Sequence, residues 1–142
     1  MAEERNTPPI FVHLTVKGGL EAIEFYARAF GAEEDFKQMA DDGKRVLHAT
    51  LSMFSGHVML NDEFPEYSPD VMAPPTAGGA SITVHVNLDS PAKVDEAMTR
   101  AADAGCEITQ PAMDAFWGAR YGRLRDPFGH IWSFGAELPK QS

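Results

Sequence analysis

The 142-residue sequence has little cysteine and little positive charge, and these two shortages exclude whole classes of protein. Its single cysteine, Cys106, excludes a disulfide framework and the cysteine-rich zinc modules. Against 21 aspartates and glutamates there are only 12 lysines and arginines, which gives a formal net charge of −9. This balance argues against a nucleic-acid partner, because contacts to the phosphate backbone need clustered Lys and Arg.

A long apolar run is also missing. The first nine residues carry Glu3, Glu4 and Arg5 and no apolar core of the kind that a secretory signal has. The longest uncharged stretch, residues 71–88, is interrupted by prolines and glycines, so we do not expect it to form a membrane helix. No phosphate-cradling glycine loop, Ser-His-Asp order or paired-carboxylate motif stands out. We expect a cytoplasmic protein with neither a membrane nor a nucleic-acid partner.

What the sequence does contain is an internal repeat. Residues 56–60 are similar to residues 129–133 at an offset of 73, and residues 11–16 are similar to residues 83–88 at an offset of 72. A looser similarity links residues 27–33 to residues 99–107. Three matches in the same order and at nearly one spacing indicate two copies of one module.

Hydrophobic periodicity predicts the same βαβββ order in both modules. In the first module, residues 10–61, we expect a strand at 10–17, a helix at 19–30, and strands at 32–40, 44–53 and 57–61. In the second, residues 80–136, we expect a strand at 80–88, a helix at 91–104, and strands at 106–110, 118–125 and 130–135. Residues 62–79 hold four prolines and two glycines and are predicted to be a linker. Residues 1–9 are predicted to be a disordered tail and residues 137–142 a C-terminal tail.

Several motifs carry a resemblance to a known family. Residues 20–26 read Leu-Glu-Ala-Ile-Glu-Phe-Tyr and lead to Phe-Gly-Ala at 30–32, and residues 126–132 read Asp-Pro-Phe-Gly-His-Ile-Trp. With the βαβββ order, these motifs resemble the vicinal oxygen chelate superfamily of glyoxalase I, bleomycin-resistance proteins and extradiol dioxygenases. Residues 116–122 are similar to its PhnB-like branch. The resemblance implies an α+β fold, in which tandem βαβββ modules form curved mixed sheets around a cavity with helices on the outer face, and a homodimer.

The resemblance also implies a divalent metal in active members, with ligands on the first and last strand of each module. At the positions that it assigns to these ligands, the sequence has Phe11, Leu60, Thr83 and Ser133. None of these is a carboxylate or an imidazole, the usual ligands of such ions. His13 and His85 lie two residues further along their strands. We therefore expect no metal cofactor. The alternative is one Zn, Ni, Fe or Mn ion held by His13, His48 and His85.

The two-residue period of a strand assigns side chains to the cavity or to the helices. From the first, third and last strands we expect the following to face the cavity: Phe11, His13, Thr15, Thr83, His85 and Asn87; His48, Thr50, Ser52, Tyr121, Arg123 and Arg125; Val58, Leu60, Ile131 and Ser133. We expect Ile10, Val12, Val84 and Val86 to pack against the helices. His57 and His130 are expected to point away from the cavity.

From this set we predict a ligand-binding site of His13, His48, His85, Trp117, Tyr121, Arg123 and Ser133. Its arginines suit an anionic group, and its aromatic rings suit the face of a flat molecule. The alternatives are histidines that only bond to their neighbours, arginines in surface ion pairs, and rings that pack in the core or in a dimer. Cys106 is expected to be a buried apolar residue rather than a catalytic thiol.

Two functions are compatible with these features. The first is a homodimeric protein that binds a small organic molecule without a metal. The second is a metal-dependent isomerase, lyase or dioxygenase, in which the ion polarises vicinal oxygens and a nearby base moves a proton. The missing carboxylates favour the first function.

Overall fold

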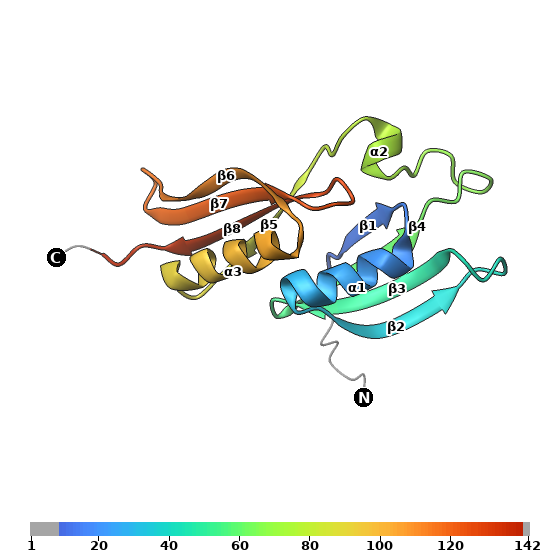
Figure 1. The fold of residues 1–142 in the computed structure, drawn as a ribbon, viewed down its shortest axis with the longest axis horizontal. Coiled ribbons are helices and arrows are strands. Elements are labelled where there is room, and N and C mark those ends of the chain that lie inside the picture. The colour runs from blue at the N-terminus through green and yellow to red at the C-terminus, as the bar shows by residue number, and fades with distance from the viewer. Residues whose placement is uncertain (1–8, 141–142) are drawn as a thin grey trace.

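The computed structural model describes residues 9–140 of the chain and contains eight strands and three helices (Figure 1). The first module comprises β1 (Val12–Val16), α1 (Gly19–Phe30), β2 (Glu33–Met39), β3 (Val46–Met53) and β4 (Gly56–Asp62). After α2 (Pro74–Ala77), the second comprises β5 (Thr83–Asn87), α3 (Pro91–Ala104), β6 (Glu107–Asp114), β7 (Ala119–Arg125) and β8 (Ile131–Glu137). The predicted α+β fold of tandem βαβββ modules is confirmed. The predicted N-terminal tail lies, except for Pro9, outside the described residues.

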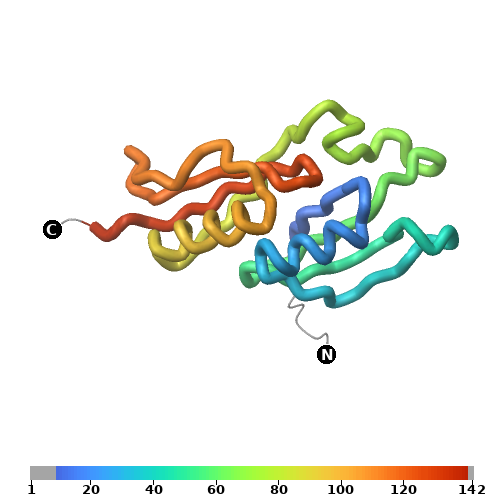
Figure 2. Tube along the Cα trace, in the orientation of Figure 1, coloured from blue at the N-terminus to red at the C-terminus, as the bar shows by residue number. Residues whose placement is uncertain are grey.

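Each module forms its own four-stranded mixed sheet. The strand orders are β1-β4-β3-β2 and β5-β8-β7-β6. In each sheet the first and last strands of the module pair in parallel, and the other pairs are antiparallel. One helix packs on one face of each sheet, and the modules lie side by side where α1 meets α3 (Figures 1 and 2). In the described part of the chain, no helix is long and apolar enough to cross a membrane.

A buried carboxylate fixes the start of α1. Asp62, at the end of β4, accepts hydrogen bonds from the backbone N–H groups of Gly18, Gly19 and Val46. These bonds satisfy donors that the first turn of a helix leaves without partners. A Cβ atom on Gly19 would lie 2.8 Å from Val46 Cβ, so only glycine allows the helix to approach the sheet this closely.

A second buried carboxylate joins the two modules. Asp126 accepts hydrogen bonds from the backbone N–H groups of Phe128 and His130 and from Trp132 Nε1, at 2.8, 3.0 and 2.9 Å. It also accepts one from the hydroxyl of Tyr26, which lies on α1 of the other module. Burial first, and then the charge of Asp126, raises the pKa of Tyr26 well above its usual value, so this hydroxyl keeps its proton.

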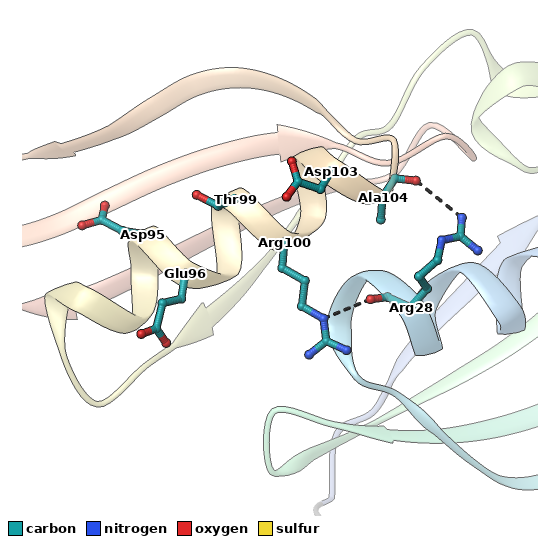
Figure 3. Close-up of a pocket in the computed structure, with 7 residues that line it drawn as sticks. All are labelled: Arg28, Asp95, Glu96, Thr99, Arg100, Asp103 and Ala104. Atoms are coloured by element: carbon teal, nitrogen blue, oxygen red, sulfur yellow. Dashed lines mark hydrogen bonds between the residues drawn. The ribbon is translucent and has the colours of Figure 1, made fainter.

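Arginines on the two helices bind each other's C-terminal turns. Arg100 Nε on α3 donates to the carbonyl oxygen of Arg28 on α1 at 3.0 Å, and Arg28 Nη2 donates to that of Ala104 at 3.5 Å (Figure 3). Around this contact, aromatic rings from both modules pack into one core. They are Phe25, Tyr26, Phe30, Phe54, Phe128, Trp132 and Phe134.

The register of β4, the last strand of the first module, shows that the expected position of Leu60 is wrong. His13 pairs with Met59, whereas His85 pairs with Ser133, so Met59 and not Leu60 is the counterpart of Ser133. Val58 and Leu60 are buried on the helix side, and their expected place in the cavity is wrong. The turns with Gly56 and Gly129 align at an offset of 73 residues. The strands that follow them align at an offset of 74, which is the separation of Met59 and Ser133.

The same shift corrects the orientation of His57. It was expected to point away, but it pairs with Ser52 and lies on the side of the sheet opposite to Val58. Its Nδ1 is 3.4 Å from Ser52 Oγ, and its ring stacks on that of Phe11 with centroids 5.5 Å apart. His130, in contrast, bonds through Nε2 to the backbone oxygen of Thr15 at 2.9 Å and helps to join the modules.

We predict that the substitution Tyr26→Phe lowers the free energy of unfolding by about 1–3 kcal/mol, since it removes a buried hydrogen bond to a carboxylate. Urea denaturation measures this change. The control is Tyr67→Phe, because Tyr67 is 80% exposed and should lose almost nothing. Equal effects of the two substitutions would show that the bond between Tyr26 and Asp126 does not stabilise the fold.

Candidate functional site

Each sheet has one face that its helix does not cover, which we call its open face. The strand register orders the side chains on these faces into rows. On the second sheet one row is Arg123, Ser133 and His85, and the next is Tyr121, Gly135 and Asn87. On the first sheet the row equivalent to Arg123, Ser133 and His85 is Thr50, Met59 and His13.

Hydrogen bonds hold both ring nitrogens of His85. Its Nδ1 lies 2.7 Å from Ser133 Oγ, and its Nε2 lies 3.0 Å from Asn87 Oδ1. An amide oxygen can only accept, so Nε2 carries a proton, and in the Nε2–H tautomer the hydroxyl of Ser133 donates to Nδ1. Ser133 is 2% exposed, which makes it a positioning residue beneath the ring rather than a group that meets solvent.

Gly135 provides the space that this ring occupies. A Cβ atom there would lie 2.9 Å from Cε1 of His85. Asn87 and Gly135 were not predicted as site residues. The period-two pattern places Asn87 on the face of His85, but only the pairing of β5 with β8 shows that Gly135 lies next to Asn87.

Aromatic rings extend the open face of the second sheet away from His85. The rings of His85 and Tyr121 are nearly parallel, at 15°, with centroids 6.0 Å apart. Trp117 meets Tyr121 edge-on at 5.6 Å and is 56% exposed. These three rings form a wall beside Arg123, which lies two residues after Tyr121 on β7.

The open face of the first sheet carries a pair of histidines. The rings of His13 and His48 meet edge-on with centroids 6.2 Å apart, and Phe36 lies 6.0 Å from His48. Burial lowers the pKa of His13, and the charge of His48 lowers it further, while a hydrogen bond to Asn61 acts in the opposite direction. The unprotonated form of His13 is therefore favoured.

The structure divides the predicted site residues between the two sheets. It brings His85, Trp117, Tyr121, Arg123 and Ser133 together on the second open face, and it places His13 and His48 on the first. Within residues 9–140, no three His, Cys, Asp or Glu side chains lie close enough together to hold a metal ion. One chain thus does not assemble the alternative ion site of His13, His48 and His85.

The strand register also shows which side chains lie opposite the positions assigned to metal ligands. Residues directly opposite each other on neighbouring strands have the closest side chains. His85 is the residue in register with Ser133, whereas Thr83 is in register with Ile131. His85, and not Thr83, is therefore the residue of β5 that lies directly beside Ser133.

The donor atoms in these rows do not fit a divalent ion of the carboxylate–imidazole type. The partner of His85 is a neutral hydroxyl, and the partner of His13 is the thioether of Met59. His85 already uses both nitrogens in hydrogen bonds. Outside these rows, Cys106 is buried, and burial together with the nearby Asp126 raises its pKa to about 12, so its thiol is unreactive at neutral pH.

Three comparisons relate this chain to known proteins. The family model described as the Glyoxalase/Bleomycin resistance protein/Dioxygenase superfamily matches residues 11–134. An uncharacterized protein of Mycobacterium bovis is 39% identical over 129 residues, which cover 90% of this chain and 82% of that protein. The crystal structure of TioX from Micromonospora superposes with a TM-score of 0.67 and 29% identity, covering 95% of this chain and all of TioX. A PhnB protein from Bacillus cereus has the same TM-score at 20% identity, covering 91% of this chain and 99% of its own, and shows the likeness of fold alone.

We predict that the stability of the protein falls as the pH drops below about 6.5, the pKa of an unperturbed histidine. His13 binds a proton more weakly in the folded than in the unfolded chain, so its contribution is complete above that pH and is lost toward its lower folded-state pKa. In thermal unfolding at pH 7.5 and pH 5.5, the variant His13→Gln should lose less stability than the native protein. The same loss in both proteins would contradict the role assigned to His13.

Proposed function

The chain belongs to the Glyoxalase/Bleomycin resistance protein/Dioxygenase superfamily, and on this premise we propose that it binds a small organic molecule on its open faces without a divalent metal. The observation that carries the proposal is the hydrogen bonding of His85. Its two ring nitrogens are bonded to Ser133 and Asn87, in the row that joins the first and last strands of the module. An ion would have to displace these bonds and would gain no carboxylate in return.

This arrangement suits a binding site for an organic ligand. A ring whose tautomer and orientation are fixed presents the same surface to every ligand molecule, which lowers the conformational cost of binding. Flat apolar surface from Tyr121 and Trp117, with the polar groups of Arg123 and Asn87 beside it, matches the usual composition of small-molecule sites. No step of this function requires a bond to be made or broken.

We further propose that the protein acts as a homodimer. Within residues 9–140 the open faces of both sheets are uncovered and carry large exposed apolar side chains, among them Phe36 on the first sheet and Met113 on the second. In the described chain β1, β2, β5 and β6 are sheet edges, each with one side unpaired. A second copy would cover apolar surface and edges that a monomer leaves in water.

Metal analysis tests the absence of an ion. We expect protein that is purified without chelator or affinity tag to hold far less than one equivalent of Zn, Ni, Fe or Mn. The variant Ser133→Glu is the positive control, because it places a carboxylate in register with His85 and should gain affinity for zinc. Leu60 is the position that the resemblance assigns to a ligand in the first module. It is not substituted, because its side chain is buried in the core. Near one equivalent of metal in the native protein, lost on substitution of His13 or His85, would favour the metal-dependent enzyme instead.

Light scattering tests the dimer. We expect a mass of twice the 15.5 kDa of the chain at micromolar concentration. The substitution Phe36→Glu, on the first sheet and remote in sequence from the residues of the second open face, should shift the population toward the monomer. A mass of 15.5 kDa throughout the concentration series would contradict the proposal.

A further inference from the structure

One arginine differs from all the others in the described chain. Of the six arginines within residues 9–140, five donate hydrogen bonds to carboxylates or to backbone oxygens: Arg28, Arg45, Arg100, Arg120 and Arg125. Arg123 makes neither an ion pair nor a side-chain hydrogen bond to any described residue, and it lies half-buried on the open face of the second sheet. Although the protein has a net charge of −9, this guanidinium has no counter-ion among residues 9–140.

The row of Arg123 contains no carboxylate. It continues with the hydroxyl of Ser133 and the ring of His85 on one side, and with the amide of Gln110 on β6 on the other. Two residues further along β7, Arg125 lies on the same face, and its Nη1 pairs with Glu107 at 3.3 Å. An anion from outside the chain is therefore the natural partner of Arg123. A planar guanidinium binds a carboxylate through two parallel hydrogen bonds.

The other neighbour of Arg123 is flat and aromatic. Tyr121 precedes it by two residues on the same face, which is a separation of about 7 Å along the strand. The ring of Tyr121 lies between those of His85 and Trp117. A ligand that reached Arg123 with its charged end would have the Tyr121–Trp117 wall beside its body, and aromatic rings pack favourably against such a wall.

From these observations we propose that the open face of the second sheet binds planar aromatic carboxylates, with the carboxylate on Arg123 and the ring against Tyr121 and Trp117. This inference rests on the proposed function, since it names the ligand class of the same site. Ser133 and Asn87 serve as positioning residues, because they hold the ring of His85 that backs Tyr121.

Three matched probes separate the charge from the ring. The probes are 2-naphthoate, the neutral alcohol 2-naphthalenemethanol, and cyclohexanecarboxylate, which has the charge without the aromatic ring. Isothermal titration calorimetry of the full chain measures each affinity. We expect 2-naphthoate to bind at least about 10-fold more tightly than the alcohol, as a charge-assisted hydrogen-bond pair implies. It should also bind about 3- to 10-fold more tightly than the cyclohexane acid.

Variants then assign the two contributions to residues. Arg123→Gln should weaken 2-naphthoate about 10-fold or more and leave the alcohol nearly unchanged. Tyr121→Leu should weaken 2-naphthoate about 3- to 10-fold and have less effect on cyclohexanecarboxylate. Arg125→Gln is the matched control on the same strand and face, and it should change affinity less than about twofold because its side chain is already paired with Glu107. Circular dichroism spectra that match the native protein confirm that each variant is folded.

Three results would overturn the inference. They are equal binding of the acid and the alcohol, full affinity for 2-naphthoate in Arg123→Gln, or no binding of 2-naphthoate by the native protein. Each of these leaves the proposed function standing, because that function names no ligand class and metal analysis tests its metal-free character separately. Near one equivalent of bound metal together with selective binding of 2-naphthoate would have the opposite meaning: the ligand class would hold and the metal-free function would fail.

Discussion

The buried carboxylate of Asp126 is the interaction on which the arrangement of the two modules depends. Its side chain closes the turn between β7 and β8 through the N–H groups of Phe128 and His130, binds Trp132 at the start of β8, and reaches Tyr26 in the other module. Four hydrogen bonds offset the cost of burying a charge in an aromatic core. Because the turn leads directly into β8, the same carboxylate holds the strand that places Ser133 beside His85.

The two modules share this framework but differ on their open faces. On the first sheet the central row holds Thr50, Met59 and His13, and no charged residue lies in it. On the second sheet the equivalent row holds Arg123, Ser133 and His85, with Tyr121 in the next row. Packing on the helix side fixes the fold and leaves these positions free to vary. The two open faces therefore differ in their chemistry, and the second carries the arginine and the aromatic rings on which the proposed ligand site depends.

Much of this architecture could be predicted from the sequence, because burial on one side of a strand or helix leaves a periodic pattern. Both long helices and the outward orientation of His13, His48, His85 and Tyr121 followed from that pattern. The side chains of the last strand of the first module were assigned to the wrong faces. The reason is that Gly56 was matched to Gly129, which puts the two last strands one residue out of register. In the structure Phe54 and Ser55 carry positive φ angles of 50° and 61° in the first turn without being glycine, so a glycine alone was an unreliable marker of the turn. A shift of one residue reverses every side chain of a strand.

The contacts of the site lay beyond prediction for a different reason. The bonds of His85 to Ser133 and Asn87, and the lack of a partner for Arg123 among the described residues, depend on rotamers and on pairing between residues far apart in the sequence. Nitrogen-15 NMR of the His85 ring, with and without one equivalent of zinc, tests the central claim most directly. We predict a proton on Nε2 and no change in either ring nitrogen when zinc is added. A zinc-dependent shift of either ring nitrogen into the range of a metal-bound imidazole would contradict it.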